Sequence, residues 1–150
     1  MLICFCIKRN AMYSSLDEAR RIFNVAPFIT SLGCQLDKLE SGVCHSHIVL
    51  QELHQQQDGF VHAGVQATLA DHTAGTAAVT LIEEGQRVLT AEFKINLLRA
   101  AKGTELVCRS SILKPGRMLI IAESEVYARQ PDNALVLVSK ATVTLAVTSK

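Results

Sequence analysis

The feature that most constrains the fold of this chain is one long alanine-rich segment over residues 63–83. A turn of the form Gly-x-x-His-x-Gly, residues 59–64, runs straight into it. Small apolar residues recur along the segment at helical spacing, and Asp71 is its single acid before Glu83. A charged group among apolar residues costs free energy unless something pairs with it or uses it. We therefore predict a buried helix in which Asp71 is either functional or structurally paired.

Strand patterns account for most of the remaining chain. A helix over residues 15–24, ending near Pro27, precedes two strands at residues 32–39 and 43–50. After the long helix come four segments rich in Val, Ile, Leu and Thr, at residues 87–98, 104–113, 118–129 and 135–147. This order predicts the α+β class, with an antiparallel sheet and one helix packed on one face.

Composition limits both the domain count and the kind of partner. The 150 residues fit one domain, which we place at residues 15–150 behind a disordered or extension segment at residues 1–14. Fifteen Lys and Arg stand against 14 Asp and Glu, and there is no Trp. This balance argues against nucleic-acid and membrane-surface partners. The apolar start is too short to span a bilayer, and its charges follow it, so no secretory signal is indicated and we expect a cytoplasmic protein.

The cysteines and paired histidines indicate neither a disulfide framework nor a metal site. Five cysteines are present, an odd number, and no Cys-x-x-Cys occurs. His45 and His47 share one face of a predicted strand while Cys44 points to the other. Without a nearby carboxylate, two histidines on the solvent side of the strand are the better reading, and we predict no metal.

A helical wheel places Asp71 at the edge of the alanine stripe. The polar residues His72, Thr73, Thr76 and Thr80 fall largely on the opposite side of the helix, with Leu69 among them. The helical neighbours of Asp71 are all small and include Gly64, Thr68 and Gly75. Such neighbours leave room for a substrate or a second subunit beside the carboxylate. The alternative is a buried acid paired with an arginine or hydrogen-bonded to a strand.

Residues 59–71, Gly-Phe-Val-His-Ala-Gly-Val-Gln-Ala-Thr-Leu-Ala-Asp, closely resemble the signature of hotdog-fold acyl-CoA thioesterases of the phenylacetate-degradation (PaaI) type. Residues 90–103 resemble the strand that follows the helix in that family, and the resemblance extends over about residues 15–148. It implies a curved antiparallel sheet wrapped around one long central helix. It also implies dimers formed by edge-to-edge sheets, often paired into tetramers, with sites at the subunit interface.

The resemblance also implies roles for the residues of the turn and helix. Asp71 matches the catalytic acid, which acts as general base on water or as nucleophile on the thioester carbon. Ala63 stands where the family has a glycine whose backbone N–H polarises the thioester carbonyl, and Gly64 matches the second glycine. His62 matches the motif histidine, whose expected job is to anchor the loop. The substrate would be an acyl-CoA, with no separate cofactor.

Further positions carry over less directly. Gln56 occupies the place of a family asparagine near the carbonyl or the water, and Gln55 and Gln57 are the alternatives. Where relatives use a helper hydroxyl from the next strand, the ungapped position is Leu89, and the adjacent Thr90 is expected to point to the other face. Thr68 is expected to line the substrate groove. The cations expected to bind the coenzyme A phosphates are Arg99, Lys102, Lys114 and Arg117.

Two other functions fit the same motif. Hotdog hydratases and dehydratases of acyl thioesters usually pair an Asp with a His, but His72 lies about 100° around the helix from Asp71. A non-enzymatic acyl-CoA-binding module would usually come with an output domain, for which 150 residues leave no room. The acid at the motif position favours the thioesterase.

Overall fold

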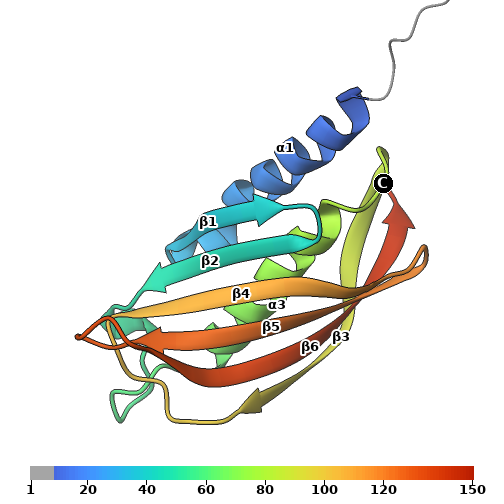
Figure 1. Ribbon diagram of the computed structural model, residues 1–150. Coiled ribbons are helices and arrows are strands. Elements are labelled where there is room, and N and C mark those ends of the chain that lie inside the picture. The colour runs from blue at the N-terminus through green and yellow to red at the C-terminus, as the bar shows by residue number, and fades with distance from the viewer. Residues whose placement is uncertain (1–8) are drawn as a thin grey trace, which may run out of the picture.

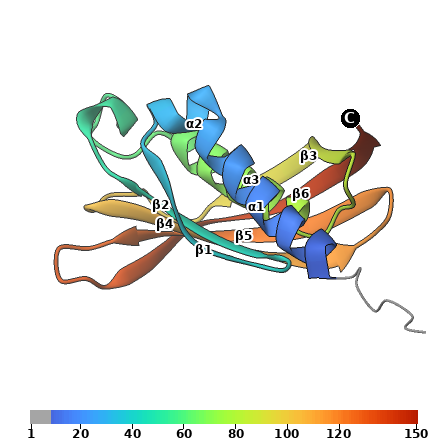
Figure 2. The ribbon, with the colours of Figure 1, turned by 90° about the horizontal axis from the view of Figure 1, so that it is seen from above.

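A computed structural model describes residues 9–150 as one curved six-stranded antiparallel sheet with its helices on one side (Figures 1 and 2). The strand order is β1-β2-β4-β5-β6-β3, so β1 and β3 are the edges. The elements are α1 (Arg9–Val25), α2 (Pro27–Ser31), β1 (Cys34–Glu40), β2 (Val43–Val49), η1 (Glu52–His54), α3 (Ala63–Val79), β3 (Gln86–Leu97), β4 (Glu105–Pro115), β5 (Leu119–Arg129) and β6 (Leu135–Ser149). The predicted α+β class and hotdog fold are confirmed.

Side chains of the central strands alternate between a buried face and a more exposed face, as expected for a sheet that helices cover on one side. In β2, Cys44, Ser46 and Ile48 are buried, whereas His45 and His47 lie on the other face, as predicted. The covered face packs on α3, whose alanines at positions 70, 74, 77 and 78 are fully buried. Because these side chains are small, the helix lies close to the sheet, and this contact forms the main core.

The threonine side of α3 differs from the wheel prediction. Thr73, Thr76 and Thr80 are buried instead of forming a polar face, and Leu69 points into the core. Each threonine hydroxyl donates to a carbonyl of its own helix, at 2.6–2.9 Å, so burial leaves no hydroxyl unpaired. The cover on the other side comes from α1, whose Phe23 ring lies 4.7 Å from the His72 ring. Thr73 faces the sheet, where its hydroxyl lies 2.6 Å from the Ser46 hydroxyl of β2, and Thr80 accepts from the Gly42 N–H at 2.7 Å. Contacts with other elements therefore bury threonines that the pattern of a single helix marks as polar.

Several element boundaries also differ from those predicted. The first helix begins at Arg9 and not at residue 15, while residues 1–8 lie outside the described chain. A short helix that was not predicted, α2, starts at Pro27, which suits the first turn of a helix. The long helix ends at Val79, four residues early, and Gly85 with φ +81° lies in the turn before β3.

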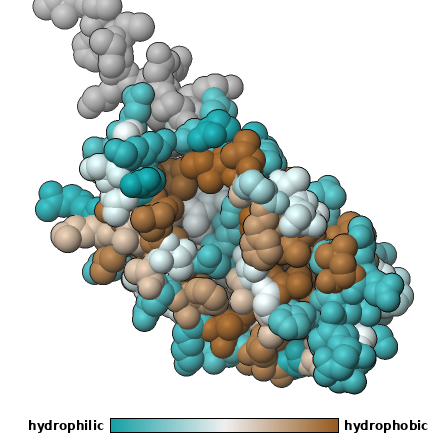
Figure 3. All heavy atoms as spheres, turned by 180° about the vertical axis from the view of Figure 1, so that it is seen from behind, coloured by the Kyte–Doolittle hydropathy of each residue, from teal (hydrophilic) through white to brown (hydrophobic). Residues whose placement is uncertain are grey.

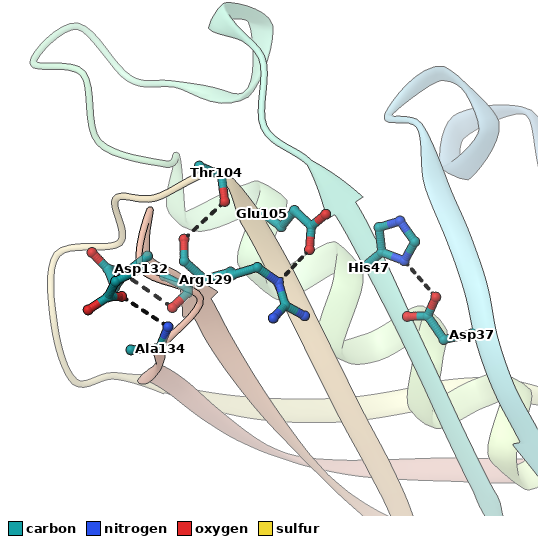
Figure 4. A network of polar contacts seen from close by, with 9 residues as sticks. Asp37, His47, Thr104, Glu105, Arg129, Asp132 and Ala134 are labelled. Atoms are coloured by element: carbon teal, nitrogen blue, oxygen red, sulfur yellow. Dashed lines mark hydrogen bonds and ion pairs between the residues drawn. The ribbon is translucent and has the colours of Figure 1, made fainter.

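The outer face of the sheet is bound together by charged and aromatic pairs. Arg129 pairs with Glu105 at 2.7 Å, and Asp37 pairs with His47 at 2.7 Å (Figure 4). Lys140 bridges Glu123 and Glu125, each at 3.2 Å. These pairs tie neighbouring strands together across the outer face.

Within residues 9–150, no group of three or more His, Cys, Asp or Glu side chains is arranged to hold a metal ion. Burial raises the pKa of Cys34 to about 11 and that of Cys44 to about 12, so these thiols stay protonated. Among the described helices, none combines the length and the apolarity needed to cross a bilayer.

Leu106 and Leu113 on β4 offer a matched test of this core. Leu106 is fully buried against α3, whereas Leu113 is 55% exposed near the end of the same strand. Leu106→Ala should lower the free energy of unfolding by about 2–5 kcal/mol, because it leaves a cavity. Leu113→Ala should change it by less than about 0.5 kcal/mol. Urea titration of both variants measures the difference, and equal losses would contradict the packing described.

Candidate active site

The turn into α3 leaves one backbone donor free. His62 is the N-cap residue, and its Nδ1 accepts from the Gly64 N–H at 2.9 Å. The Val65 N–H donates to the His62 carbonyl at 3.0 Å. No described residue accepts from the Ala63 N–H, the first donor of the helix. The capping histidine thus holds the turn, and Ala63 presents an N–H at the positive end of the helix dipole.

Asp71 lies half-buried two turns further along α3. Its Oδ1 accepts from the Thr90 hydroxyl of β3 at 2.8 Å. Burial raises the pKa of the Asp71 carboxyl, and the hydrogen bond from Thr90 opposes that rise. Among the described residues no Lys, Arg or His makes an ion pair with Asp71, whereas the hydrogen bond from Thr90 of β3 matches the other alternative, an acid hydrogen-bonded to a strand.

The orientation of Thr90 is the reverse of the one predicted. Thr90 stands opposite Leu145 of β6, a buried core residue, so its side chain faces α3. Leu89 stands opposite Ala146 and points to the outer face, where it is exposed. An alignment without a gap assigns the family's helper-hydroxyl position to Leu89, one residue before Thr90. Alternation counted from the half-buried Val88 would have placed Thr90 on the helix side.

Two cavities flank the start of α3. The first, here called the amide pocket, has a volume of about 400 Å³, and its walls include Gln56, Ala63, Gln66, Leu97 and Arg99. The second, the α2 pocket, has about 330 Å³, and its walls include Phe28, Leu32, Leu53, His62, Gly64, Val65 and Thr68. A larger cavity of about 560 Å³ lies at the far end of α3, beside Glu18 and Lys150. It touches none of the predicted site residues.

Gln56 and Gln57 lie in different surroundings. Gln56 lines the amide pocket beside Ala63, and its Oε1 accepts from the Asp58 N–H. Gln57 is exposed, and its Nε2 donates to the Asp58 carboxylate at 3.1 Å. Of the two, Gln56 is therefore the one that the structure brings to the turn.

Gln66 was missed by the sequence analysis. It is only 3% exposed, and it donates from Nε2 to the Val61 carbonyl over 3.4 Å. Its Oε1 is buried and has no hydrogen-bond partner among the described residues. A buried amide oxygen left unpaired costs free energy in the empty protein. The available signal was a glutamine one turn after Ala63 on the sheet side of the helix.

The predicted cations fall at two ends of the sheet. Arg99 lines the amide pocket, and its Nη1 donates to the Leu137 carbonyl at 2.9 Å. Lys102 belongs to the same loop, which the Val61 N–H ties down at the Ala101 carbonyl over 2.9 Å. Lys114 and Arg117 lie at the opposite end of β4, an 11-residue strand about 35 Å long. Within one subunit they are remote from Ala63.

The side chains of His72 and Asp71 do not pair with each other. Its ring packs on Phe23 of α1, and burial lowers its pKa, which keeps the imidazole neutral. Asp71 instead points toward Thr90 on β3. The Asp–His pair that a hydratase reading needs is absent from this part of the chain.

Comparison with known proteins agrees with this geometry. A thioesterase family protein from Silicibacter pomeroyi is 34% identical, and the match covers 91% of this chain and 99% of that one with a TM-score of 0.88. A candidate esterase from Saccharolobus solfataricus is 25% identical over 113 residues, 75% of each chain. The PaaI protein of E. coli, at 13% identity, shares the fold over 92% of this chain and 96% of its own, with a TM-score of 0.79.

These relatives support a hydrolase. The family model for the thioesterase superfamily matches residues 58–134, which contain the turn, Asp71 and Thr90. The chain belongs to the thioesterase superfamily.

Proposed function

We propose that the protein hydrolyses acyl-CoA thioesters to a free acid and coenzyme A. The observation that carries the proposal is a half-buried carboxylate with no cationic partner, in a chain whose helix start offers a free N–H. The Ala63 N–H donates to the thioester oxygen and stabilises the charge that develops on it. In one route water adds to the carbonyl carbon while Asp71 takes up the water proton. In the other route the Asp71 carboxylate attacks the carbon and forms an acyl–Asp71 anhydride, which water later hydrolyses to the free acid. The C–S bond then breaks, and the thiolate takes up a proton.

The two halves of this site are too far apart to act within one subunit. Ala63 and Asp71 are eight positions apart on one helix, which is about 12 Å along its axis. A donor to the carbonyl oxygen and a base at the carbon must each lie within about 3 Å of the groups they serve. We therefore assign Asp71 of one subunit and the Ala63 N–H of a second subunit to each site.

The edge strand β3 supplies the surface for that second subunit. It is twelve residues long and exposed along most of its length. Its side facing α3 carries Phe93 and Leu97, which are 43% and 50% exposed. Seen from the side opposite to that of Figure 1, apolar side chains gather around a hollow (Figure 3). A long exposed edge of this kind is a template for pairing, and pairing β3 with its copy would bring the two α3 helices together.

Two cationic side chains that could bind the coenzyme portion of the substrate lie near the start of α3. Arg99 and Lys102 are close to the turn and suit the phosphates of coenzyme A. No resident cofactor or metal enters the proposed reaction. A binding module without chemistry is the second candidate, and the substitution below separates the two.

Asp71→Asn should reduce kcat for release of free thiol from acyl-CoA by at least about 100-fold, because the amide has no basic oxygen to replace the carboxylate. The exposed Asp17 provides a matched control, and Asp17→Asn should retain the wild-type rate. Thiol-trapping assays over an acyl-CoA panel measure both. An equally active Asp71→Asn protein would remove Asp71 from the mechanism.

Thr90→Val should move the acid limb of the kcat/KM pH profile to higher pH. Asp71 acts only when ionised, and the Thr90 hydrogen bond favours the ionised form, so its loss raises the Asp71 pKa. Thr90→Ser keeps the donor and should keep the wild-type profile. An unmoved limb in Thr90→Val would show that this hydrogen bond does not tune the base.

Ala63→Pro tests the shared site, since proline lacks the N–H but is well tolerated at the first helical position. The preceding His62 already has φ −58° and ψ 139°, which a residue before proline favours. Ala63→Pro alone should be inactive, while Ala63→Gly should be active.

Co-expression of Ala63→Pro with Asp71→Asn should restore about a quarter of the wild-type activity per protein. Half of the dimers then contain both chains, and one of the two sites in each is intact. The absence of any recovery in verified mixed dimers would place both groups of the site in one chain.

A further inference from the structure

We propose that Gln66 binds the attacking water, with its side-chain oxygen accepting a hydrogen bond from one of the two water O–H groups. The proposal rests on the thioesterase function inferred above and adds a catalytic residue to that site. Gln66 follows Ala63 by three positions on α3, and both residues line the amide pocket. Residues three apart on a helix are neighbours, with Cβ atoms about 5–6 Å apart. The Gln66 oxygen and the Ala63 N–H can therefore serve one reacting carbon.

The hydrogen bond made by Gln66 fixes which way its amide points. Nε2 donates to the Val61 carbonyl at 3.4 Å, and a flipped amide would place two oxygens against each other there. Oε1 therefore points away from the Val61 carbonyl. It is buried, and none of the described residues donates to it. A buried acceptor of this kind costs free energy until a ligand or a water supplies a donor.

The other groups of the amide pocket that can still bond to a ligand are donors. The Asp58 N–H occupies the Oε1 of Gln56, which leaves the Gln56 Nε2 to donate. Ala63 offers its free backbone N–H, and the Arg99 guanidinium can only donate. A thioester carbonyl matches such donors, but it has no proton to give to Gln66. Water has two O–H groups, and the cavity of about 400 Å³ is large against the roughly 30 Å³ that one water occupies.

All protons are accounted for when water binds in this way. In the base-assisted route the water oxygen bonds to the carbonyl carbon, and one water proton passes to Asp71 of the other subunit. The second O–H donates to Gln66 Oε1 and keeps its proton. The former carbonyl oxygen carries the negative charge and accepts from the Ala63 N–H. When the C–S bond breaks, the carbonyl re-forms as the free acid, and the thiolate takes the proton from Asp71. In the anhydride route the same contact orients the water that hydrolyses the anhydride.

The test offers methanol as a competing nucleophile to the full-length protein. Methanol has one O–H, which passes its proton to Asp71, so none is left for Gln66. Gln66→Met keeps the length of the side chain but removes the acceptor. Hydrolysis of the acyl-CoA that the wild type cleaves fastest should slow about tenfold, which is the effect of one hydrogen bond, while methyl-ester formation should keep its rate. The ratio of acid to methyl ester should therefore fall about tenfold.

Two further measurements separate this role from a structural one. Both products form in one sample, so their ratio does not depend on the fraction of protein that is folded. Gln66→Met should also keep the urea midpoint of the wild type, because it removes a buried oxygen that lacks a donor. A lower midpoint with equal losses for water and methanol would overturn the proposal. Gln35→Met is the matched control, since Gln35 is exposed on β1, at the sheet edge opposite to β3, and both rates should stay unchanged.

A substrate N–H is the other group that matches the Gln66 oxygen chemically. An acyl thioester of propanethiol contains no N–H, so it separates the two donors. Gln66→Met should slow its hydrolysis by the same factor of about ten as that of acyl-CoA. A loss confined to acyl-CoA would overturn the proposal and make Gln66 a contact for the coenzyme.

Failure of this proposal differs from failure of the thioesterase function. No thiol release from any acyl-CoA by the wild-type protein would end both. Thiol release with the same acid-to-ester ratio in wild type and Gln66→Met would overturn the role of Gln66 alone. If that unchanged ratio came with weaker subunit association by light scattering, Gln66 would be a contact with the second copy.

Discussion

The rest of the structure depends on how closely α3 lies against the sheet. Alanines at the contact let the helix approach, and buried hydroxyls then fix its position. Ser124 of β5 donates to the Ala70 carbonyl at 2.8 Å, and Ser46 of β2 lies 2.6 Å from the Thr73 hydroxyl. Both contacts are within two residues of Asp71. Because buried hydrogen bonds of this kind are costly to leave unmade, the helix cannot slide along the sheet, and Asp71 stays opposite Thr90.

The same packing leaves the chain incomplete on one side. The sheet side of α3 is filled by the core and another side by α1, so Asp71 can meet a substrate only along the stripe next to β3. That stripe is uncovered, and so is the strand beside it. Three separate features are left unsatisfied in a single subunit: the exposed edge strand, the exposed Phe93, and the distance of about 12 Å between Asp71 and the proposed oxyanion donor, Ala63. The proposed two-fold pairing of β3 with its copy would remove all of them together.

What the sequence could predict follows from how local each feature is. Hydrophobic periodicity is a local property, so the strands, the long helix and the unusual place of Asp71 were all predictable. The inward turn of Thr90 depends on its pairing with β6, and the burial of Thr73 depends on β2, whose Ser46 hydroxyl lies 2.6 Å from the Thr73 hydroxyl. The burial of the unpaired Gln66 oxygen depends on residues 97–101, which line the amide pocket together with Gln66. Contacts between distant segments decided each of these features, and no pattern within one segment encodes such contacts.

The elements differ in how much they contribute to the core, and this determines where substitutions are tolerated. The proposed catalytic groups lie on α3 and β3, where the Asp71–Thr90 hydrogen bond couples them to the packed core. The exposed residues Phe28 and Leu53 lie on α2 and η1, two short surface segments that contribute little to that core. Substitutions there change an exposed surface and cost little stability, whereas substitutions beneath Asp71 disturb the helix itself. The surface around α2 and η1 can therefore change while the fold around Asp71 stays fixed.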